Sequence, residues 1–430
     1  MHLTITEYQK IPREQIGATR LQRLERLDRS HAAGSGEHIF DWSAMDTIRA
    51  LNHVGVVQVP GLTVEILPKI EQVNDMTNDG EIPPQRARHN LLYMLAVTRC
   101  LPIRERHLAA LRVQRMSLLE ALIAIFARAL VDELRRGLHH DYVRREENGH
   151  RLKGKLLLTQ HLRANVARRD RMWVAFDEFL PDNLINRILK ATCMRLVSLT
   201  RVTRTRQLLQ EALIEMEQVD AQRIDNHHFE QVHLSRNSQR FEHLVDFCRL
   251  VLSNRSPAPT AGELSSFTLL FAMDQLFEEF VGRMIRRHAD SLGFDRRQVR
   301  LQAHGDRRWL LRTSTDQGRF RLIPDVVVKG AGRLPQLILD TKWKRLRTDA
   351  EDARNGVSQA DIYQLFAYAQ QYQCPLSILL YPAVSGVSPK CYRIAHDAHE
   401  RQIKIAFIDL SVDLAANNGR FVDELQAALA

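Results

Sequence analysis

The sequence has few cysteines and no long hydrophobic run, and both absences narrow the class of protein. Its five cysteines are isolated from one another and no Cys-x-x-Cys pair occurs, which argues against a disulfide framework and a cysteine-based zinc site. No apolar stretch approaches the roughly 20 residues that a transmembrane helix needs. The first residues also lack the pattern of a secretory signal. We therefore expect a cytoplasmic protein without membrane contact.

Lysine is also scarce, and the large basic surplus comes from arginine. Only ten of the 61 basic residues are lysines, and the 51 acidic residues leave a formal net charge of +10. This surplus favours a polyanionic partner, most simply nucleic acid, although arginine-rich usage on solvated faces would give the same balance. We do not expect the chain to bind a nucleotide itself, because it has no Gly-x-x-x-x-Gly-Lys-Ser/Thr phosphate loop.

The 430 residues suffice for two or three domains, and the local pattern suggests three. Residues 1–80 are rich in β-branched side chains and predict a β-rich N-terminal domain. Residues 81–262 show mainly helical spacing of apolar side chains, whereas residues 263–430 change to short strands mixed with helices. We therefore predict a multidomain α+β protein with a β-rich first domain, a mainly helical middle domain and a C-terminal α/β domain.

Within these regions, the spacing of apolar side chains predicts individual elements. Residues 54–68 alternate around a central Pro60-Gly61 turn and predict a β-hairpin. The other predicted elements are a strand pair at 141–159, a helix at 265–288, strands at 319–328 and 336–342, and a helix at 359–373.

The most informative residues lie on the two strands predicted between 319 and 342. Asp325 follows Pro324 within the first strand, and Asp340 and Lys342 close the second. Because side chains alternate along a strand, Asp340 and Lys342 point to one face, and pairing of the two strands would bring Asp325 beside them. Asp340-Thr-Lys342 is also the only Asp/Glu-x-Lys triplet in the sequence.

Two carboxylates and an ammonium group at the end of a sheet suit phosphodiester hydrolysis. Carboxylates bind Mg²⁺ or Mn²⁺, and such a metal neutralises a phosphate and lowers the pKa of a bound water. A lysine can steer or help deprotonate that water and stabilise developing charge. Asp325 and Asp340 are therefore candidate metal ligands, and Lys342 is a candidate catalytic residue. A cross-strand ion pair is the alternative interpretation of an isolated Asp-x-Lys.

Two predicted helices add candidate residues to this site. On the helix before the strands, Glu278 borders the apolar face and Glu279 points further away, so Glu278 is the better candidate for a third metal ligand. A solvated glutamate pair is the alternative. On the helix after the strands, Gln364 and Tyr368 share a face, where an amide and a phenol could contact the scissile phosphate. Such a pair is otherwise usually structural.

These residues resemble the PD-(D/E)xK nuclease superfamily, and Gln364-x-x-x-Tyr368 is similar to its RecB-like branch. The rest of the chain is similar to the McrC family, the nuclease subunits of McrBC methylation-dependent restriction systems. The matching segments occur in the order Gly61–Lys69, Asn90–Met94, Arg136–Leu138 with Asp141-Tyr142, Lys153–Lys155, Phe176–Phe179, Asn186–Lys190, Leu276–Glu278 and Asp361–Gln364.

The resemblance implies a division of labour within an antiviral restriction complex. Residues 263–430 would form a Mg²⁺-dependent PD-(D/E)xK nuclease domain, while residues 1–80 and 81–262 would contact the partner, and the latter also DNA. In this family the partner is McrB, a hexameric AAA+ GTPase that recognises methylated cytosine in double-stranded DNA, and the nuclease subunit stimulates its GTP hydrolysis. Two alternatives stay open: a stand-alone PD-(D/E)xK repair or junction-resolving nuclease, and a non-catalytic adaptor that activates a GTPase.

Overall fold

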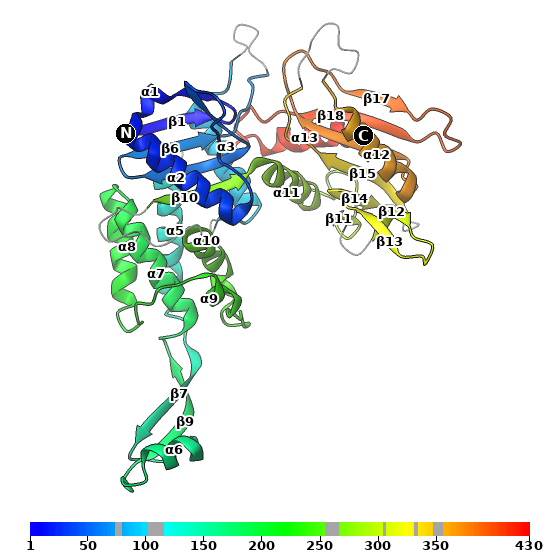
Figure 1. Ribbon diagram of the computed structural model, residues 1–430. Coiled ribbons are helices and arrows are strands. Elements are labelled where there is room, and N and C mark those ends of the chain that lie inside the picture. The colour runs from blue at the N-terminus through cyan, green and yellow to red at the C-terminus, as the bar shows by residue number, and fades with distance from the viewer. Residues whose placement is uncertain (74–79, 102–115, 254–265, 304–306, 331–333, 347–355) are drawn as a thin grey trace. The chain divides into compact units, whose positions relative to one another are not determined.

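The computed structural model describes residues 1–73, 80–101, 116–253, 266–303, 307–330, 334–346 and 356–430 (Figure 1). It is a mixed α+β structure, as predicted, and it divides into two compact units. The first comprises Met1–Cys100, Arg104–Leu118 and Ser256–Ala430, and the second comprises Leu101–Ile103 and Leu119–Arg255. No helix within the described ranges is both long enough and apolar enough to cross a bilayer. The division into three separately folding domains, 1–80, 81–262 and 263–430, stays a prediction.

The first unit contains a four-stranded sheet of order β1–β6–β5–β10. Its strands are β1 (His2–Thr6), β5 (His53–Val59), β6 (Leu62–Leu67) and β10 (Phe267–Ala272). Strands β5 and β6 form an antiparallel hairpin with Gly61 in the turn at φ 83°, a left-handed conformation that glycine adopts without strain. The hairpin predicted at 54–68 is therefore confirmed.

Strand β10 corrects one prediction from the sequence. The helix predicted over 265–288 begins too early, because residues up to Ala272 form β10 and the helix α11 occupies Met273–Arg287. A short apolar run is compatible with a helix or a buried strand, and here antiparallel pairing with β5 decides the outcome. Gly55 of β5 permits this pairing, because a Cβ atom there would lie 2.0 Å from the carbonyl oxygen of Leu269.

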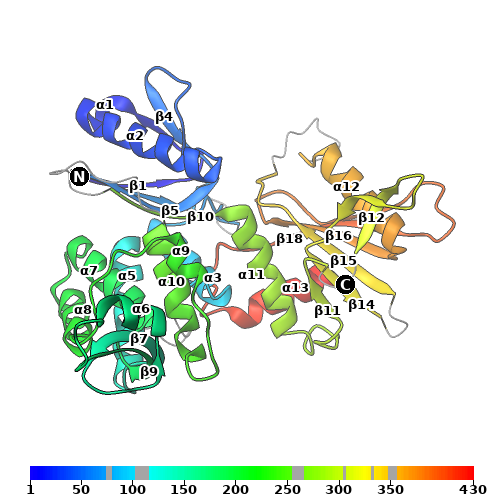
Figure 2. The ribbon, with the colours of Figure 1, turned by 60° about the horizontal axis from the view of Figure 1, so that its bottom comes forward.

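A helix that the sequence analysis missed packs on this sheet (Figure 2). Helix α2 (Ala18–Ser35) follows the short α1 (Arg13–Ile16), and its Leu24 and Leu27 are buried in one apolar core with Val57 of β5. A small sheet of order β2–β4–β3 accompanies them, with β2 at Lys10–Pro12, β3 at Phe40–Asp41 and β4 at Thr47–Ala50. The N-terminal region therefore contains a long helix beside the strands that the sequence predicts.

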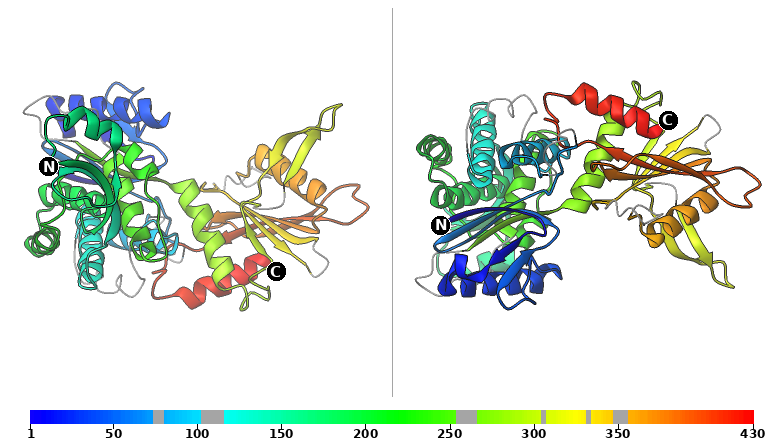
Figure 3. Two further views of the ribbon diagram at one scale, coloured as in Figure 1. Left: turned by 90° about the horizontal axis from the view of Figure 1, so that it is seen from below. Right: turned by 90° about the horizontal axis from the view of Figure 1, so that it is seen from above.

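The C-terminal part of the first unit is built on a six-stranded sheet of order β11–β14–β15–β16–β18–β17. Its strands are β11 (Val299–Leu301), β14 (Val326–Lys329), β15 (Pro335–Thr341), β16 (Leu376–Pro382), β17 (Lys390–Arg393) and β18 (Gln402–Ile408). Strands β14 and β15 are antiparallel, whereas β15, β16 and β18 are parallel. Figure 3 shows α12 (Gln359–Tyr372) on one face, and α11 and α13 (Asn418–Leu429) on the other.

The single strand predicted at 319–328 is broken in the structure. Its first part is β13 (Gly318–Leu322), which pairs with β12 (Arg308–Arg312) as a separate hairpin, and its second part is β14. Pro324 lies between them, and proline has no N–H group to donate to a central ladder. Asp325 consequently stands immediately before β14 and not within a strand.

Helix α3 (Pro84–Val97) connects the N-terminal and C-terminal parts of the first unit. Its fully buried Asn90 donates from Nδ2 to the carbonyl oxygens of Leu410 at 2.9 Å and Val412 at 2.7 Å. The same side chain accepts a hydrogen bond from the N–H group of Leu414 at 3.2 Å. One amide side chain therefore satisfies three backbone groups of a segment more than 300 residues away in sequence.

The second unit is mainly helical, as predicted for this region. Its helices are α5 (Leu118–Leu134), α7 (Leu184–Leu199), α8 (Thr203–Glu215), α9 (Asn226–Glu230), the 3₁₀ helix η1 (Gln239–Phe241) and α10 (Glu242–Ser253). Phe126 of α5 stacks on Phe247 of α10, with ring centroids 5.1 Å apart. Both rings are fully buried, so the helices share an apolar core.

A long β ribbon projects from these helices (Figure 1). It consists of β7 (Asp141–Gly149), β9 (Met172–Leu180), the short β8 (Lys155–Leu156) and α6 (Leu158–Ala164). The strand pair predicted at 141–159 does not form between neighbours, because β7 and β8 both pair with β9. The sequence analysis missed β9, and with it the pairing.

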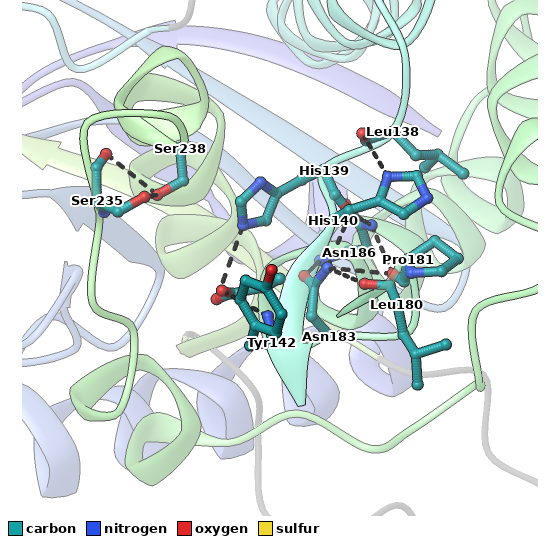
Figure 4. A network of polar contacts seen from close by, with 11 residues as sticks. Leu138, His139, His140, Tyr142, Leu180, Pro181, Asn183, Asn186, Ser235 and Ser238 are labelled. Carbon is teal, nitrogen blue, oxygen red and sulfur yellow. Dashed lines mark hydrogen bonds and ion pairs between the residues drawn. The ribbon is translucent and has the colours of Figure 1, made fainter. Parts of the chain in front are cut away.

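The root of this ribbon is held by two asparagines (Figure 4). Asn183 and Asn186, at the start of α7, donate from Nδ2 to the carbonyl oxygen of His139 at 2.8 and 2.7 Å. Asn186 also donates to the carbonyl oxygen of Pro181 at 2.7 Å. Because His139 precedes β7 and Pro181 follows β9, these bonds fasten both strands of the ribbon to one helix.

Candidate active site

The structure brings Asp325, Asp340 and Lys342 together at one edge of the six-stranded sheet. Strands β14 and β15 are antiparallel, with Val326 opposite Leu339, so the start of one strand lies beside the end of the other. Asp325 Oδ2 accepts hydrogen bonds from the backbone N–H group of Thr341 at 2.6 Å and from its Oγ1 at 2.7 Å. The hairpin pairing expected from the sequence therefore holds, although Asp325 precedes its strand.

Asp340 and Lys342 form a buried ion pair. Lys342 Nζ lies 2.5 Å from Asp340 Oδ2, and Asp340 is 2% exposed. This carboxylate oxygen has no well-aligned hydrogen-bond donor within the described residues. Burial alone would lower the pKa of Lys342, but the adjacent Asp340 outweighs burial and raises it. The lysine is therefore held as a cation.

The acidic groups at this edge repel one another. Burial raises the pKa of Asp325, and the negative charges of Asp340 and Glu278 raise it further, against the two hydrogen bonds from Thr341. Burial also raises the pKa of Asp340, although Lys342 opposes this shift. The cost of holding these carboxylates together as anions is one that a bound cation would remove.

The donor chemistry fits a divalent cation, and the geometry fits it in part. Carboxylate oxygens are the ligands that Mg²⁺ and Mn²⁺ prefer, although Asp340 Oδ2 already has the Lys342 ammonium as its ion-pair partner. No group of three or more His, Cys, Asp or Glu side chains in the described ranges is close enough together to hold a metal ion. Asp325 and Asp340 are the two carboxylates at this edge, while Glu278 Oε1 accepts a hydrogen bond from Gln302 at 3.3 Å.

Glu278 and Glu279 of α11 have different surroundings. Burial raises the pKa of Glu278. A hydrogen bond from Gln302 lowers this pKa in part, and the negative charge of Asp340 raises it further. Glu279 forms an ion pair with Arg283 at 2.6 Å. The structure thus places Glu278 within electrostatic reach of the site and engages Glu279 on its own helix.

Exchanging these two glutamates in turn separates their roles. If this site cleaves DNA with a bound metal, as the resemblance implies, Glu278→Gln is expected to lower the cleavage rate about 10-fold or more, because it removes one negative charge that would attract the metal. Glu279→Gln has the same change of charge and serves as the matched control. Its cleavage rate is expected to stay within about twofold of wild type, because an ion pair within one helix contributes little to stability. Cleavage rates over a Mg²⁺ titration measure both. Equal losses in the two variants would contradict this assignment.

Gln364 and Tyr368 of α12 contact each other and the segment before Asp325. Gln364 Nε2 donates to Tyr368 Oη at 2.7 Å, and Tyr368 Oη donates to the carbonyl oxygen of Ile323 at 3.2 Å. Tyr368 is buried, and burial, followed by the charge of Asp340, raises its pKa. Here Tyr368 supports the backbone that carries Asp325, while Gln364 is exposed. A contact of either with the scissile phosphate stays a prediction.

Three further residues at the site were missed by the sequence analysis. Lys344 Nζ lies 2.9 Å from Asp361 Oδ2, and Tyr381 Oη donates to the same oxygen at 3.2 Å. Both Lys344 and Asp361 influence the pKa of Asp340. Lys344 continues the alternation of Asp340 and Lys342, so that signal was present in the sequence. Asp361 and Tyr381 come from other elements; the sequence analysis named Asp361 only as part of the resemblance and gave it no role in the site.

Comparison with known proteins identifies similar chains. Residues 48–382 match the family model described as McrBC 5-methylcytosine restriction system component. A protein of Escherichia coli strain K12, described as type IV methyl-directed restriction enzyme EcoKMcrBC, is 21% identical over 291 residues, which cover 65% of this chain and 80% of that protein. The family match covers well over half of the sequence.

Two solved structures from Thermococcus gammatolerans share the fold. One, a half-complex from a tetradecameric assembly of McrB AAA+ hexamers with bound McrC, has a chain that aligns with a TM-score of 0.67 and 20% identity. That alignment covers 99% of this chain and 100% of the other. The second, a cryo-EM structure of the McrBC complex, aligns with a TM-score of 0.51 and 22% identity over 67% of this chain and 88% of the other.

Proposed function

Because the chain belongs to the family of McrBC 5-methylcytosine restriction system components, we propose that it is the DNA endonuclease subunit of a GTP-driven, modification-dependent restriction complex. The observation that carries this proposal is the meeting of Asp325, Asp340 and Lys342 at the edge formed by β14 and β15. Two carboxylates and a charged lysine beside adjoining strand ends are groups suited to metal-dependent phosphodiester cleavage.

In the proposed reaction, Asp325 and Asp340 would hold a divalent cation, and Glu278 is the third candidate ligand. A bound Mg²⁺ supplies positive charge to the phosphate and lowers the pKa of a water. Thr341 fixes the orientation of Asp325 through its N–H and hydroxyl groups. Lys342, kept protonated by Asp340, stabilises the negative charge that develops on the phosphate in the transition state.

We also propose that the chain acts with a hexameric McrB-like AAA+ GTPase and stimulates its GTP hydrolysis. In support, the chain aligns over 99% of its length with a chain of the T. gammatolerans assembly of McrB AAA+ hexamers with bound McrC. The missing Gly-x-x-x-x-Gly-Lys-Ser/Thr motif agrees with a subunit that leaves GTP hydrolysis to its partner. The net charge of +10 agrees with double-stranded DNA as the substrate.

The test combines the purified chain with an McrB-like GTPase from the same organism and follows GTP turnover and cleavage of methylated and unmethylated DNA with Mg²⁺. Cleavage that requires partner and GTP, together with faster GTP turnover, is the expected result. Efficient cutting by the chain alone would instead identify a stand-alone nuclease. Faster turnover without cutting of either DNA would identify a non-catalytic adaptor.

A further inference from the structure

The β12–β13 hairpin concentrates positive charge that the proposed reaction does not use. Residues 307–322 contain five arginines and one acidic residue, Asp316, which gives a net charge of +4. Asp316 is already paired with Arg312 at 2.8 Å. Arg319 and Arg321 are exposed, and neither has a carboxylate partner among the described residues. The hairpin therefore presents guanidinium groups that are available to an anionic ligand.

Exposed apolar side chains lie between these arginines. Phe320 is 69% exposed and Leu311 is 55% exposed. Phe320 also has a φ of 55°, a left-handed conformation that is costly for a bulky side chain. Packing does not account for this strain, because the ring lies in solvent. Exposed apolar side chains between exposed arginines are typical of a contact surface.

The hairpin is held rigidly against α12. The Arg308 guanidinium lies over the Tyr372 ring at 5.3 Å and donates to the carbonyl oxygen of Gln371 at 3.1 Å. The Trp309 ring packs over Gly318, where a Cβ atom would come within 2.3 Å of the indole. The hairpin extends from the face of the sheet that carries α12 (Figure 3). A surface that is ordered before binding loses little entropy when it binds.

The hairpin also leads directly into the candidate active site. Its second strand ends at Leu322, and the next carbonyl group, of Ile323, is held by Tyr368 at 3.2 Å. Arg321 is only four residues from Asp325, an extended length of about 13 Å. This length corresponds to about four base pairs of B-DNA, at roughly 3.4 Å each. A ligand of Arg321 therefore lies within half a helical turn of a phosphate held at Asp325.

We propose that the β12–β13 hairpin is a contact surface for double-stranded DNA beside the cleavage position. Arg319 and Arg321 bind backbone phosphates, and Phe320 packs against the sugars or base edges next to them. This inference rests on the proposed nuclease function and adds to it a surface that positions the substrate. DNA is favoured over a protein partner because the charge is concentrated, because Arg319 and Arg321 have no carboxylate partner among the described residues, and because the hairpin adjoins the site where a phosphodiester would bind.

The test compares the double variant Arg319→Gln/Arg321→Gln with wild type, using the full chain and a fluorescein-labelled DNA duplex of about 20 base pairs. Fluorescence anisotropy at several salt concentrations gives the slope of log K against log salt. The slope is expected to become less steep by about 1.8, because each lost phosphate contact removes about 0.9. In the complex with the GTPase, KM for DNA is expected to rise, while stimulation of GTP turnover stays at the wild-type level.

The matched control is Arg296→Gln/Arg297→Gln, which removes the same charge from two exposed arginines before β11. It is expected to keep the wild-type slope. Equal slopes for both double variants would overturn the proposal, and so would a hairpin variant that retains DNA binding but loses GTPase stimulation. DNA binding does not depend on cleavage, so a wild-type chain that binds through the hairpin without cutting would overturn only the proposed nuclease function.

Phe320→Gly tests the role of the strained aromatic. Glycine tolerates the positive φ, so the melting temperature is expected to equal or exceed that of wild type. DNA binding is expected to weaken because the exposed ring is lost. A lower melting temperature combined with wild-type DNA binding would show that the ring is structural and would overturn its assigned role.

Discussion

Asp340→Asn is expected to abolish DNA cleavage while the chain still folds and binds its partner. The asparagine has the same shape but cannot supply the negative charge that holds a metal beside Asp325. A loss of about 4 kcal/mol of transition-state stabilisation corresponds to a rate roughly 1,000-fold lower. Cleavage of methylated DNA in the presence of the GTPase, GTP and Mg²⁺ measures the effect.

GTP turnover in the same reaction shows whether this variant is folded and assembled. It should stay at the wild-type level, because the exchange keeps the shape of the side chain and leaves the negative charge of Asp325 near Lys342. Asp423→Asn is the matched control, since this carboxylate is exposed on α13 and lies away from the sheet edge. Wild-type-like cleavage by the Asp340→Asn variant would contradict the assignment of the active site.

Arg88→Met is expected to give the largest loss of stability. Arg88 on α3 makes two hydrogen bonds to Glu65 of β6, from Nε at 2.5 Å and from Nη2 at 2.8 Å, and Glu65 is fully buried. The substitution leaves a buried carboxylate without its counter-charge. Such a change costs about 3–5 kcal/mol of the free energy of unfolding. Chemical denaturation followed by tryptophan fluorescence measures the loss.

The remaining partners of Glu65 suggest the control. Its carboxylate also accepts from the Leu118 N–H group at 2.9 Å and from the Thr4 hydroxyl at 3.0 Å. The double variant Arg88→Met/Glu65→Leu removes the charge together with its partner and should recover part of the lost stability. A single variant within about 1 kcal/mol of wild type would show that the ion pair does not support the fold.

Local patterns predicted the elements whose partners lie nearby in sequence. The β5–β6 hairpin, the α12 helix and the Asp340-Thr-Lys342 triplet follow from alternation, helical spacing and a turn dipeptide, which neighbouring residues specify. Resemblance through ordered motifs predicted the family, and the match over residues 48–382 confirms it. The candidate site could be predicted from the sequence for the same reason, because its two strands are adjacent in sequence.

Patterns failed where distant partners decided the structure. The local sequence up to Ala272 is compatible with a helix or a strand. These residues form a strand because they pair with β5, which lies more than 200 residues earlier in the sequence. Likewise β9 was missed, although it is the strand with which both β7 and β8 pair. In both cases the local sequence permits two conformations of similar free energy, and long-range hydrogen bonds select one.

The sequence by itself determined the chemistry available to this protein: an arginine-rich chain without its own phosphate loop, and one Asp-x-Lys triplet with an acid shortly before it. Tertiary structure alone decided the surroundings of that triplet. Thr341 binds Asp325, Asp361 holds Lys344, and Trp343 Nε1 donates to Glu7 Oε2 at 3.0 Å across 336 residues. The physical reason is that residue type sets charge and donor capacity, whereas burial, pairing and pKa depend on which distant groups the folded chain brings into contact.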